Sequence, residues 1–467
     1  MKKKLLYAAI ASYQIMATCA QASDTDFLQE LQSLKAQLKA QEQLIKKLEA
    51  ELNSKIAKQD NEITKLNASA SLVKNDVSKN VNKDDVKITI APSPKIESVD
   101  GRYSFQPLGS IHADSAVFND DKNDHPDGST VRRARLGFKG IVDNDINYKV
   151  ELDFGNKDAD DSVSFKDVYL EYTGLNTTNI IVGNFKPAYG LEALGSPHHT
   201  TFIELSLPSG SFSTDQIIGL QANNGGKNHS WAIGAHNDTT TTKSTDDEAK
   251  SIVGRVTLAP INTSDKTLHF GLSQSLRSPD SSSDSVSFDT QLENSLQILE
   301  SAETGTISNV DSVYLTGIEA AALYGPVSIQ GEYFYNKINR ESLSDINING
   351  WYAQISYLLT SEVRPYISKK GIFGRIEPLK PFNLDNKTWG AWELAARYSN
   401  IDLNDGNKVQ GGEINNITLG LNWYLNNNTR LMANYIIGNT DSVTPSGANV
   451  LANDDPKIIL LRAAIDF

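Results

Sequence analysis

Apolar and polar side chains alternate along the last ten residues of the chain, which end on an aromatic residue. Side chains change face at every residue of a β-strand, so this pattern predicts a strand. Arg462 and Asp466 share its polar face. Its apolar face carries Ile459, Leu461, Ala463, Ile465 and Phe467. In an outer-membrane barrel the apolar face meets lipid and the polar face meets water in the lumen, and a final strand ending on Phe is common in that class.

The same alternation recurs from residue 103 to residue 467, for example at 146–154, 392–399 and 417–424. Turn-forming clusters such as Asp143-Asn144-Asp145 separate these segments, alternating with longer polar loops such as 238–250. At ~10 residues for each tilted strand, plus turns and loops, the region suits roughly 16 strands. We therefore expect an all-β fold, a roughly 16-stranded antiparallel transmembrane β-barrel with an aqueous channel.

The N-terminus has the three parts of an export signal. A basic Lys2-Lys3-Lys4 run is followed by an apolar stretch from Leu5 to Ala11 and by Ala20-Gln21-Ala22, which resembles a cleavage site. The alternative is a short buried helix. A signal peptide at residues 1–22 would remove Cys19, the one cysteine of the chain, so the mature protein would have no disulfide framework. No other segment approaches the ~18 consecutive apolar residues of a membrane-spanning helix.

Residues 23–67 have a heptad pattern with Lys and Glu on the flanks, which predicts a periplasmic coiled-coil helix that joins copies of the chain. The seam is formed by Leu31, Leu38, Ile45 and Leu52. An isolated amphipathic helix or a disordered charged tail is the alternative. Residues 68–102 are rich in Asn, Ser, Asp and Lys and contain Ala91-Pro-Ser-Pro94, which predicts a linker with one short strand at 86–90.

Composition agrees with a large barrel. Hydrophobic residues make up 39% of the chain and its mean hydropathy is −0.37, as expected when half of every strand and most loops are polar. The net charge of −13 argues against nucleic acid as a partner. It does not predict the selectivity of a pore, because charges of the loops and the lumen are summed together.

The predicted lumen face is rich in basic residues. If Ala134 and Leu136 face lipid, then Arg133, Arg135 and Lys139 share the lumen. An arginine on the lipid face is costly, and rings of basic side chains make anion pathways. The same parity places Lys149, Arg255, His269, Arg277, Arg397, Arg430 and Arg462 inside. Alternatively, each cation pairs with a lumen carboxylate and stiffens the wall, and the two interpretations have equal support for any single residue. Such carboxylates are Glu151, Asp167, Glu171, Glu332 and Glu393.

Five segments in this order resemble the phosphate-selective porin O and P family. They are residues 132–139 (RRARLGFK), 165–172 (FKDVYLEY), 183–192 (GNFKPAYGLE), 390–398 (GAWELAARY) and 419–424 (LGLNWY). The resemblance implies a homotrimer of 16-stranded barrels, with an arginine ladder that draws anions inward. It also implies that a loop from about Leu191 to Phe212 folds into the pore and narrows it. The ladder would fall on Arg133, Arg255, Arg277 and Arg462.

The chain departs from the family pattern at the constriction, which the resemblance places at His198, His199 and Glu204. His198 stands near the position of a lysine in phosphate-specific members, and Leu205 replaces an arginine. Ser110 stands where a ladder arginine is expected. A tight phosphate site needs permanently charged donors, so we expect none here, with more phosphate block near pH 5.5 if the histidines line the constriction. Adjacent histidines without a carboxylate cluster are also a poor metal site.

We therefore expect an outer-membrane porin of a Gram-negative bacterium. It would form a water-filled channel for passive diffusion of small hydrophilic solutes, with a mild preference for anions and with membrane lipid as a partner. No cofactor and no catalytic residue is expected. One alternative is a structural protein that tethers the membrane to the cell wall through its coiled coil. A barrel enzyme is the other, but the chain has seven His and no Gly-x-Ser-x-Gly elbow, and Asp215 near His198 is its one thin candidate.

Overall fold

The computed structural model describes residues 39, 46, 86–90, 93–119, 126–155, 163–237, 248–280, 283–294, 296, 302–441 and 455–467. The predicted signal peptide at 1–22 lies outside the described residues. So does the predicted coiled coil at 23–67, apart from Lys39 and Lys46, together with the first part of the predicted linker. No described helix is long and apolar enough to cross a membrane.

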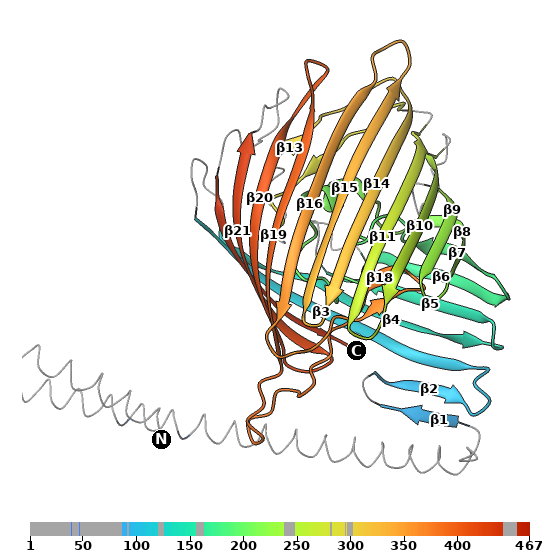
Figure 1. Ribbon diagram of the computed structural model, residues 1–467, viewed down its shortest axis with the longest axis vertical. Helices are drawn as coiled ribbons and strands as arrows, with labels where there is room; N and C mark the ends of the chain where they lie inside the picture. The colour runs from blue at the N-terminus through green and yellow to red at the C-terminus, as the bar shows by residue number, and fades with distance from the viewer. Residues whose placement is uncertain are drawn as a thin grey trace, which may run out of the picture. The chain divides into compact units, whose positions relative to one another are not determined.

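The described chain forms a closed β-barrel (Figure 1). Its main sheet has 18 strands, of which β1 (Val86–Thr89) and β2 (Lys95–Ser98) form a hairpin that continues into β3. The other 16 strands run antiparallel and make up the barrel, as the sequence predicted. They are β3 (Ser104–Asn119), β4 (Gly128–Val142), β5 (Ile146–Asp153), β6 (Ser164–Leu175), β7 (Thr178–Phe185), β8 (Ile217–Gly225), β9 (His229–Asn237), β10 (Lys250–Asn262), β11 (Lys266–Ser278), β14 (Val310–Tyr324), β15 (Val327–Arg340), β16 (Ile346–Leu358), β19 (Ala391–Asp405), β20 (Val409–Tyr424), β21 (Thr429–Asp441) and β22 (Lys457–Asp466).

The last strand closes the barrel on the first. β22 pairs with β3 from Lys457 opposite Asn119 to Asp466 opposite Ser110. Along β22 the exposed and buried positions alternate, with Arg462 buried and the apolar row from Ile459 to Ile465 exposed on the outer face. An outer face of exposed apolar side chains is what contact with lipid requires, because the hydrocarbon core offers no hydrogen-bonding partner.

A β-bulge interrupts the alternation in β4. His112 of β3 pairs with Arg133, but the next residue, Ala113, pairs with Val131, which leaves Arg132 without an opposite residue. A bulge turns two consecutive side chains toward the same face. Arg132 is therefore buried on the lumen side together with Arg133, although strict alternation would have placed it in lipid.

The connections differ at the two ends of the barrel. One end, here the turn end, has short turns such as 143–145, 263–265 and 325–326, and the opposite loop end carries most of the long connections. One connection at the turn end is long: residues 359–390, here the long turn, contain β17 (Tyr366–Ile367) and β18 (Ile372–Phe373). The sequence pattern did not predict it. In outer-membrane barrels the short turns face the periplasm.

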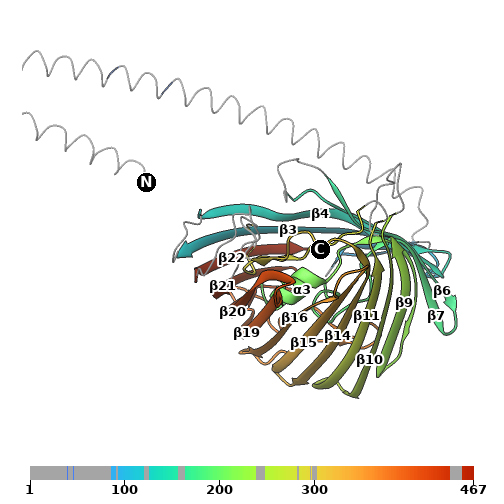
Figure 2. The ribbon, with the colours of Figure 1, turned by 90° about the horizontal axis from the view of Figure 1, so that it is seen from above.

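Residues 186–216, here the inward loop, leave the wall after β7 and fold into the barrel. They include the predicted constriction loop and the short helix α3 (Leu207–Phe212), which lies inside the ring of strands in Figure 2. Leu207 and Phe212 are buried in a cluster with Phe334 and Ile348 of the wall. The loop-end connection 279–309, with β12 (Asp289–Thr290) and β13 (Ala302–Glu303), also contacts α3 and β20. The lumen is thus narrowed by packed chain segments.

Candidate functional site

The inward loop starts on a buried carboxylate. The backbone N–H groups of Leu191 and Glu192 donate to the two oxygens of Glu332 on β15, at 2.7 and 2.8 Å, and the Tyr352 hydroxyl donates to the same carboxylate at 2.7 Å. Gly190 has φ of +71°, and a Cβ there would lie 2.9 Å from Glu332. Only glycine adopts this conformation without strain and leaves room for the carboxylate. Glu332 therefore fixes where the loop enters the lumen.

Four arginines, here the arginine clamp, hold the next part of the loop by its backbone. Arg462 donates to the carbonyl of Ile203 at 2.6 Å, and Arg397 donates to that of Glu204 at 3.1 Å. The other bonds run from Arg430 to the carbonyls of Thr200 (2.8 Å) and Pro197 (2.9 Å), and from Arg364 of the long turn to that of His199 (3.2 Å). A loop has no ladder to satisfy its own backbone groups, so buried side-chain donors replace one.

Three members of the clamp are also paired with carboxylates. Arg462 makes a two-pronged contact with Asp114, at 2.7 and 2.6 Å, and reaches Glu204 at 2.8 Å. Arg397 bridges Glu192 at 2.9 Å and Glu293 at 2.6 Å. Arg364 pairs with Glu393. Buried ion pairs of this kind contribute little net positive charge to the pore, and removing one partner strands the other at a high cost.

Other cations predicted for the lumen are also paired with carboxylates. Arg255 donates to both carboxylate oxygens of Glu319, at 2.7 Å each. It also donates to the carbonyls of Lys370 and Gly371 in the long turn. Arg135 pairs with Asp153 at 2.8 Å. Lys149 forms ion pairs with Asp167 at 2.6 Å and with Glu151 at 3.2 Å.

Lys139 and Arg277 are two further predicted lumen residues. Lys139 stands opposite Lys149 on β5, and within the described part of the chain no carboxylate lies within ion-pair distance of it. Arg277 lies at the loop end of β11, between Ser251 and Val313 in register.

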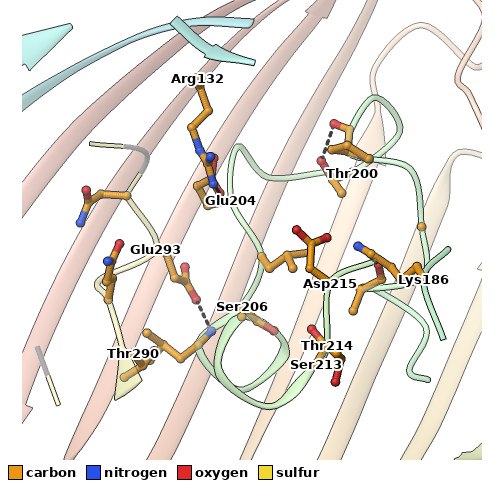
Figure 3. A pocket seen from close by; sticks show the side chains of 18 of the residues that line it. Arg132, Lys186, Thr200, Glu204, Ser206, Ser213, Thr214, Asp215, Thr290 and Glu293 are labelled. Carbon is orange, nitrogen blue, oxygen red and sulfur yellow. Dashed lines mark hydrogen bonds and ion pairs between the residues drawn. The ribbon is translucent and has the colours of Figure 1, made fainter. Parts of the chain in front are cut away.

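A cavity of about 370 Å³ opens between β4, the inward loop and residues 289–294 of the loop-end connection (Figure 3). We call it the loop-side cavity. Four cations line it, three of them on β4: Arg132, Arg133, Arg135 and Lys186. Its acidic lining residues are Glu204, Asp215, Asp289 and Glu293. The lining therefore has as many basic as acidic side chains, and the charge that a solute meets depends on which of them are already paired.

Glu204 gathers three arginines at this cavity. Arg132 donates to it at 3.1 Å, Arg133 lies 3.7 Å away, and Arg462 donates at 2.8 Å. Burial alone would raise the pKa of Glu204, but the three guanidinium groups outweigh burial and hold the pKa well below its usual range. Three arginines thus meet two carboxylates, Glu204 and the Asp114 that pairs with Arg462, which leaves one net positive charge in this group.

Some donors of this group have no protein partner. Arg132 Nη1 and Arg133 Nε are buried and make no hydrogen bond to a described residue. Lys186 Nζ donates to the carbonyl of Ala193 at 2.9 Å, and burial lowers the pKa of Lys186. Buried donors without partners are a costly arrangement that a passing anion or water would relieve.

Comparisons with known proteins agree with this architecture. The model of the family described as phosphate-selective porin O and P matches residues 105–467. The chain belongs to this porin family. It is 28% identical to Porin O of Pseudomonas aeruginosa over 399 residues, covering 77% of this chain and 88% of that protein. It is 27% identical over 376 residues to an uncharacterized protein of Caulobacter vibrioides, covering 77% and 73%.

Solved structures show the same barrel fold at low identity. OmpT of Vibrio cholerae, folded in vitro, gives a TM-score of 0.50 at 11% identity, covering 78% of this chain and 98% of that chain. OprB of Pseudomonas putida, at high pH, gives a TM-score of 0.50 at 10% identity, covering 79% and 95%. The protein is a porin, a β-barrel channel of the Gram-negative outer membrane. This family and fold argue against an enzyme.

The histidines of the porin's inward loop lie outside the loop-side cavity. His198 Nδ1 lies 3.0 Å from His112 Nε2, and neither His198 nor His199 lines the loop-side cavity. Burial, then Arg135 and Arg430, hold the pKa of His198 well below its usual range. Burial, then Arg375 and Arg430, lower the pKa of His199 to about 3. Both rings are therefore neutral near pH 7.

The structure also places the other residues that the sequence analysis named, Ser110, Leu205 and Asp215. Ser110 is buried opposite Arg135 on β4 and brings no charge. Leu205 lines the cavity. Asp215, the one thin catalytic candidate, pairs with Lys166 at 2.8 Å, while His198 contacts His112.

Three contributors were missed from the sequence. Arg132 escaped because a bulge is fixed by pairing between strands and leaves no mark in the alternation. Arg364 escaped because its loop partner is a backbone carbonyl far away in the chain. Glu332 was expected in the lumen as a partner of a cation, but its role as an acceptor for the backbone of the inward loop was not foreseen. Lys186 could have been found, since it lies in the segment Gly183-Asn-Phe-Lys186 that carries the family resemblance.

Proposed function

We propose that the porin passes small hydrophilic solutes with a mild preference for anions, and that the loop-side cavity sets this preference. The observation that carries the proposal is that Arg132 and Arg133 share Glu204 with Arg462, which Asp114 already pairs. Arg132 Nη1 and Arg133 Nε are left without a hydrogen bond to a described residue. Fixed positive charge beside a narrow aqueous path raises the local concentration of anions and repels cations.

The arginine clamp has a different role in this proposal. Arg364, Arg397 and Arg462 are neutralised by buried carboxylates and hold the inward loop in place. Arg255 likewise holds the long turn beside Glu319. Of the predicted ladder, Arg255 and Arg462 therefore act here as a scaffold. Arg133, together with Arg132 and Lys186, acts on the solute.

Reversal potentials in asymmetric KCl across planar bilayers test the proposal. We expect anions to be the more permeant ions, with a preference that shrinks as KCl rises from about 0.1 M to about 1 M, because the screening length falls from ~10 Å to ~3 Å. A cation-selective or unselective channel at low salt would overturn the proposal.

We also infer a homotrimer assembled with the help of residues 23–67. Support comes from the four-heptad seam of Leu31, Leu38, Ile45 and Leu52, which has little to bury except copies of itself. The same segment is the basis for a second role as a tether to the cell wall, which the family match does not favour over the channel.

A further inference from the structure

A second cavity of about 210 Å³ lies on the other side of the inward loop, toward the turn end. We call it the turn-side cavity. Its walls are strands β6 to β9, the inward loop at Ala188 and Leu194, and the long turn at residues 369, 370 and 372. The long turn comes close to the barrel wall here, since backbone of Lys369 lies against Gly225 at the end of β8.

One wall of the turn-side cavity is apolar. Tyr169 and Phe185 meet edge to face, with ring centroids 6.3 Å apart and an interplanar angle of 80°. Ile181, Leu194 and Ile372 complete this wall. An apolar wall of this kind offers nothing to a small inorganic ion, but an aromatic ring gains dispersion and edge-to-face contacts there.

The opposite side of the cavity is basic. Lys369 and Lys370 of the long turn are exposed, and Lys186 donates to the backbone carbonyl of Ala193. In the described ranges, no carboxylate lies within ion-pair distance of these three lysines. The other charged lining residues, Asp167 and Arg255, are already paired with Lys149 and Glu319. The cavity therefore has a net positive charge.

Two amide groups complete the arrangement. Asn223 Nδ2, a donor, and Gln221 Oε1, an acceptor, line the cavity and are buried without a hydrogen bond to any described residue. Buried amides are normally satisfied, so these two atoms point to a polar occupant of the cavity.

We propose that the turn-side cavity binds small aromatic carboxylates on their way through the channel. The carboxylate faces Lys369 and Lys370, and the ring lies against Tyr169, Phe185 and Ile181. Lys186 lines both cavities, so it can pass an anion from the arginines of the loop-side cavity to the lysines of the turn side. This inference rests on the proposed anion-preferring channel and names a solute class for it.

Block of the KCl current through the full-length porin at pH 7.5 tests the inference. The probes are benzoate, acetate, benzamide and inorganic phosphate, added on the turn side. We expect benzoate to reach half-block at a concentration about tenfold or more below acetate, because the ring buries apolar area that acetate lacks. Benzamide, which has the ring without the charge, and phosphate, which has the charge without the ring, should both block less than benzoate.

Two variants separate the contributions. Lys369→Gln/Lys370→Gln should raise the half-block concentration of benzoate about fivefold, the size expected for exposed charge pairs. Lys380→Gln, an exposed lysine of the same turn that does not line the cavity, is the matched control. Ile181→Thr keeps a β-branched residue in β7 but makes the wall of the cavity polar. It should weaken the block by benzoate and leave the block by acetate unchanged. Ile180→Thr, on the outer face, is its control.

The outcomes distinguish the two proposals. Absence of anion preference in KCl would overturn the proposed function. Normal anion preference with equal block by benzoate and acetate, or with the same benzoate block in the Lys369/Lys370 variant as in Lys380→Gln, would overturn the aromatic carboxylate site alone.

Discussion

At the scale of single residues, the lumen is organised by how its buried charges are satisfied. Arg462 and Asp114 have no exposed side-chain surface, and both oxygens of Asp114 accept hydrogen bonds from Arg462. The same arginine holds the carbonyl of Ile203 and reaches Glu204. Desolvating such groups is costly, so the pair is favourable only as long as both members are present.

Arg462→Met should therefore destabilise the barrel more than the double change Arg462→Met/Asp114→Asn. The single change leaves the Asp114 carboxylate buried without a partner, at a cost of about 3–5 kcal/mol. The measurement is the temperature at which the folded barrel converts to its unfolded electrophoretic mobility. Equal transition temperatures for the two variants would show that Asp114 does not depend on Arg462.

Phosphate block should be weak at pH 7.5 and should not increase at pH 5.5. The pKa of His199 is lowered to about 3 and that of His198 is held well below its usual range, so neither ring gains a proton between these pH values. An exposed histidine, with a pKa of ~6.5, would become charged over the same interval. Titration of the chloride current with phosphate at both pH values makes the comparison. Stronger block at pH 5.5, or micromolar block at pH 7.5, would contradict this account.

At the scale of elements, two segments inside the barrel decide the shape of the channel. The inward loop is anchored at its start by Glu332 and along its length by the arginine clamp. The long turn is held by Arg255 and in turn supplies Arg364 to the loop. The two segments thus support each other from opposite ends of the lumen.

Glu332→Ala should loosen the start of the inward loop. The N–H groups of Leu191 and Glu192 and the Tyr352 hydroxyl would lose their common acceptor, and each unsatisfied buried donor costs about 1–3 kcal/mol. Single-channel recordings should show a larger or noisier conductance. Glu332→Gln keeps the size and one acceptor oxygen and should lie between Glu332→Ala and the parent protein. Identical recordings for all three proteins would remove Glu332 from its role as an anchor.

The sequence predicted the strands well and the contents of the lumen poorly, for a physical reason. Alternation reflects the two environments of a strand, so the faces of β22 and the closed 16-stranded barrel followed from it. The bulge at Arg132 depends on pairing with β3 and has no local signal. The alternation of faces along the strands also predicted that Arg397 and Arg462 point inward. It did not predict that they donate to carbonyls of the inward loop, because only the fold brings those partners close.

At the scale of the whole molecule, the barrel presents lipid with a continuous apolar outer face, and we propose that the N-terminal segment supports assembly. Exposed apolar side chains such as Ile459 and Leu461 cover the outer wall and suit lipid as well as another barrel. The coiled coil predicted for residues 23–67 would be more specific, since knobs-into-holes packing in a coiled coil fixes the number of chains.

Deleting residues 23–67 while keeping the signal peptide should weaken the trimer without abolishing the folded barrel. Light scattering in mild detergent gives the mass of the complex for both proteins. We expect a trimer for the full chain and a shift toward smaller species at low protein concentration for the deletion. A monomeric full-length porin would contradict the assembly, and an unchanged trimer after deletion would assign it to the barrel instead.

The central claim is that the cations of the loop-side cavity, rather than the paired ladder arginines, set the anion preference of the channel. Its most direct test is the reversal potential in asymmetric KCl for Arg132→Gln/Arg133→Gln, with Arg340→Gln at the exposed loop-end hairpin as the control. Glu204 keeps Arg462 as a partner in this variant, so the constriction should stay intact. We predict a shift of the reversal potential toward cation permeation for the double variant and none for the control. A double variant with the reversal potential of the parent protein would contradict the account.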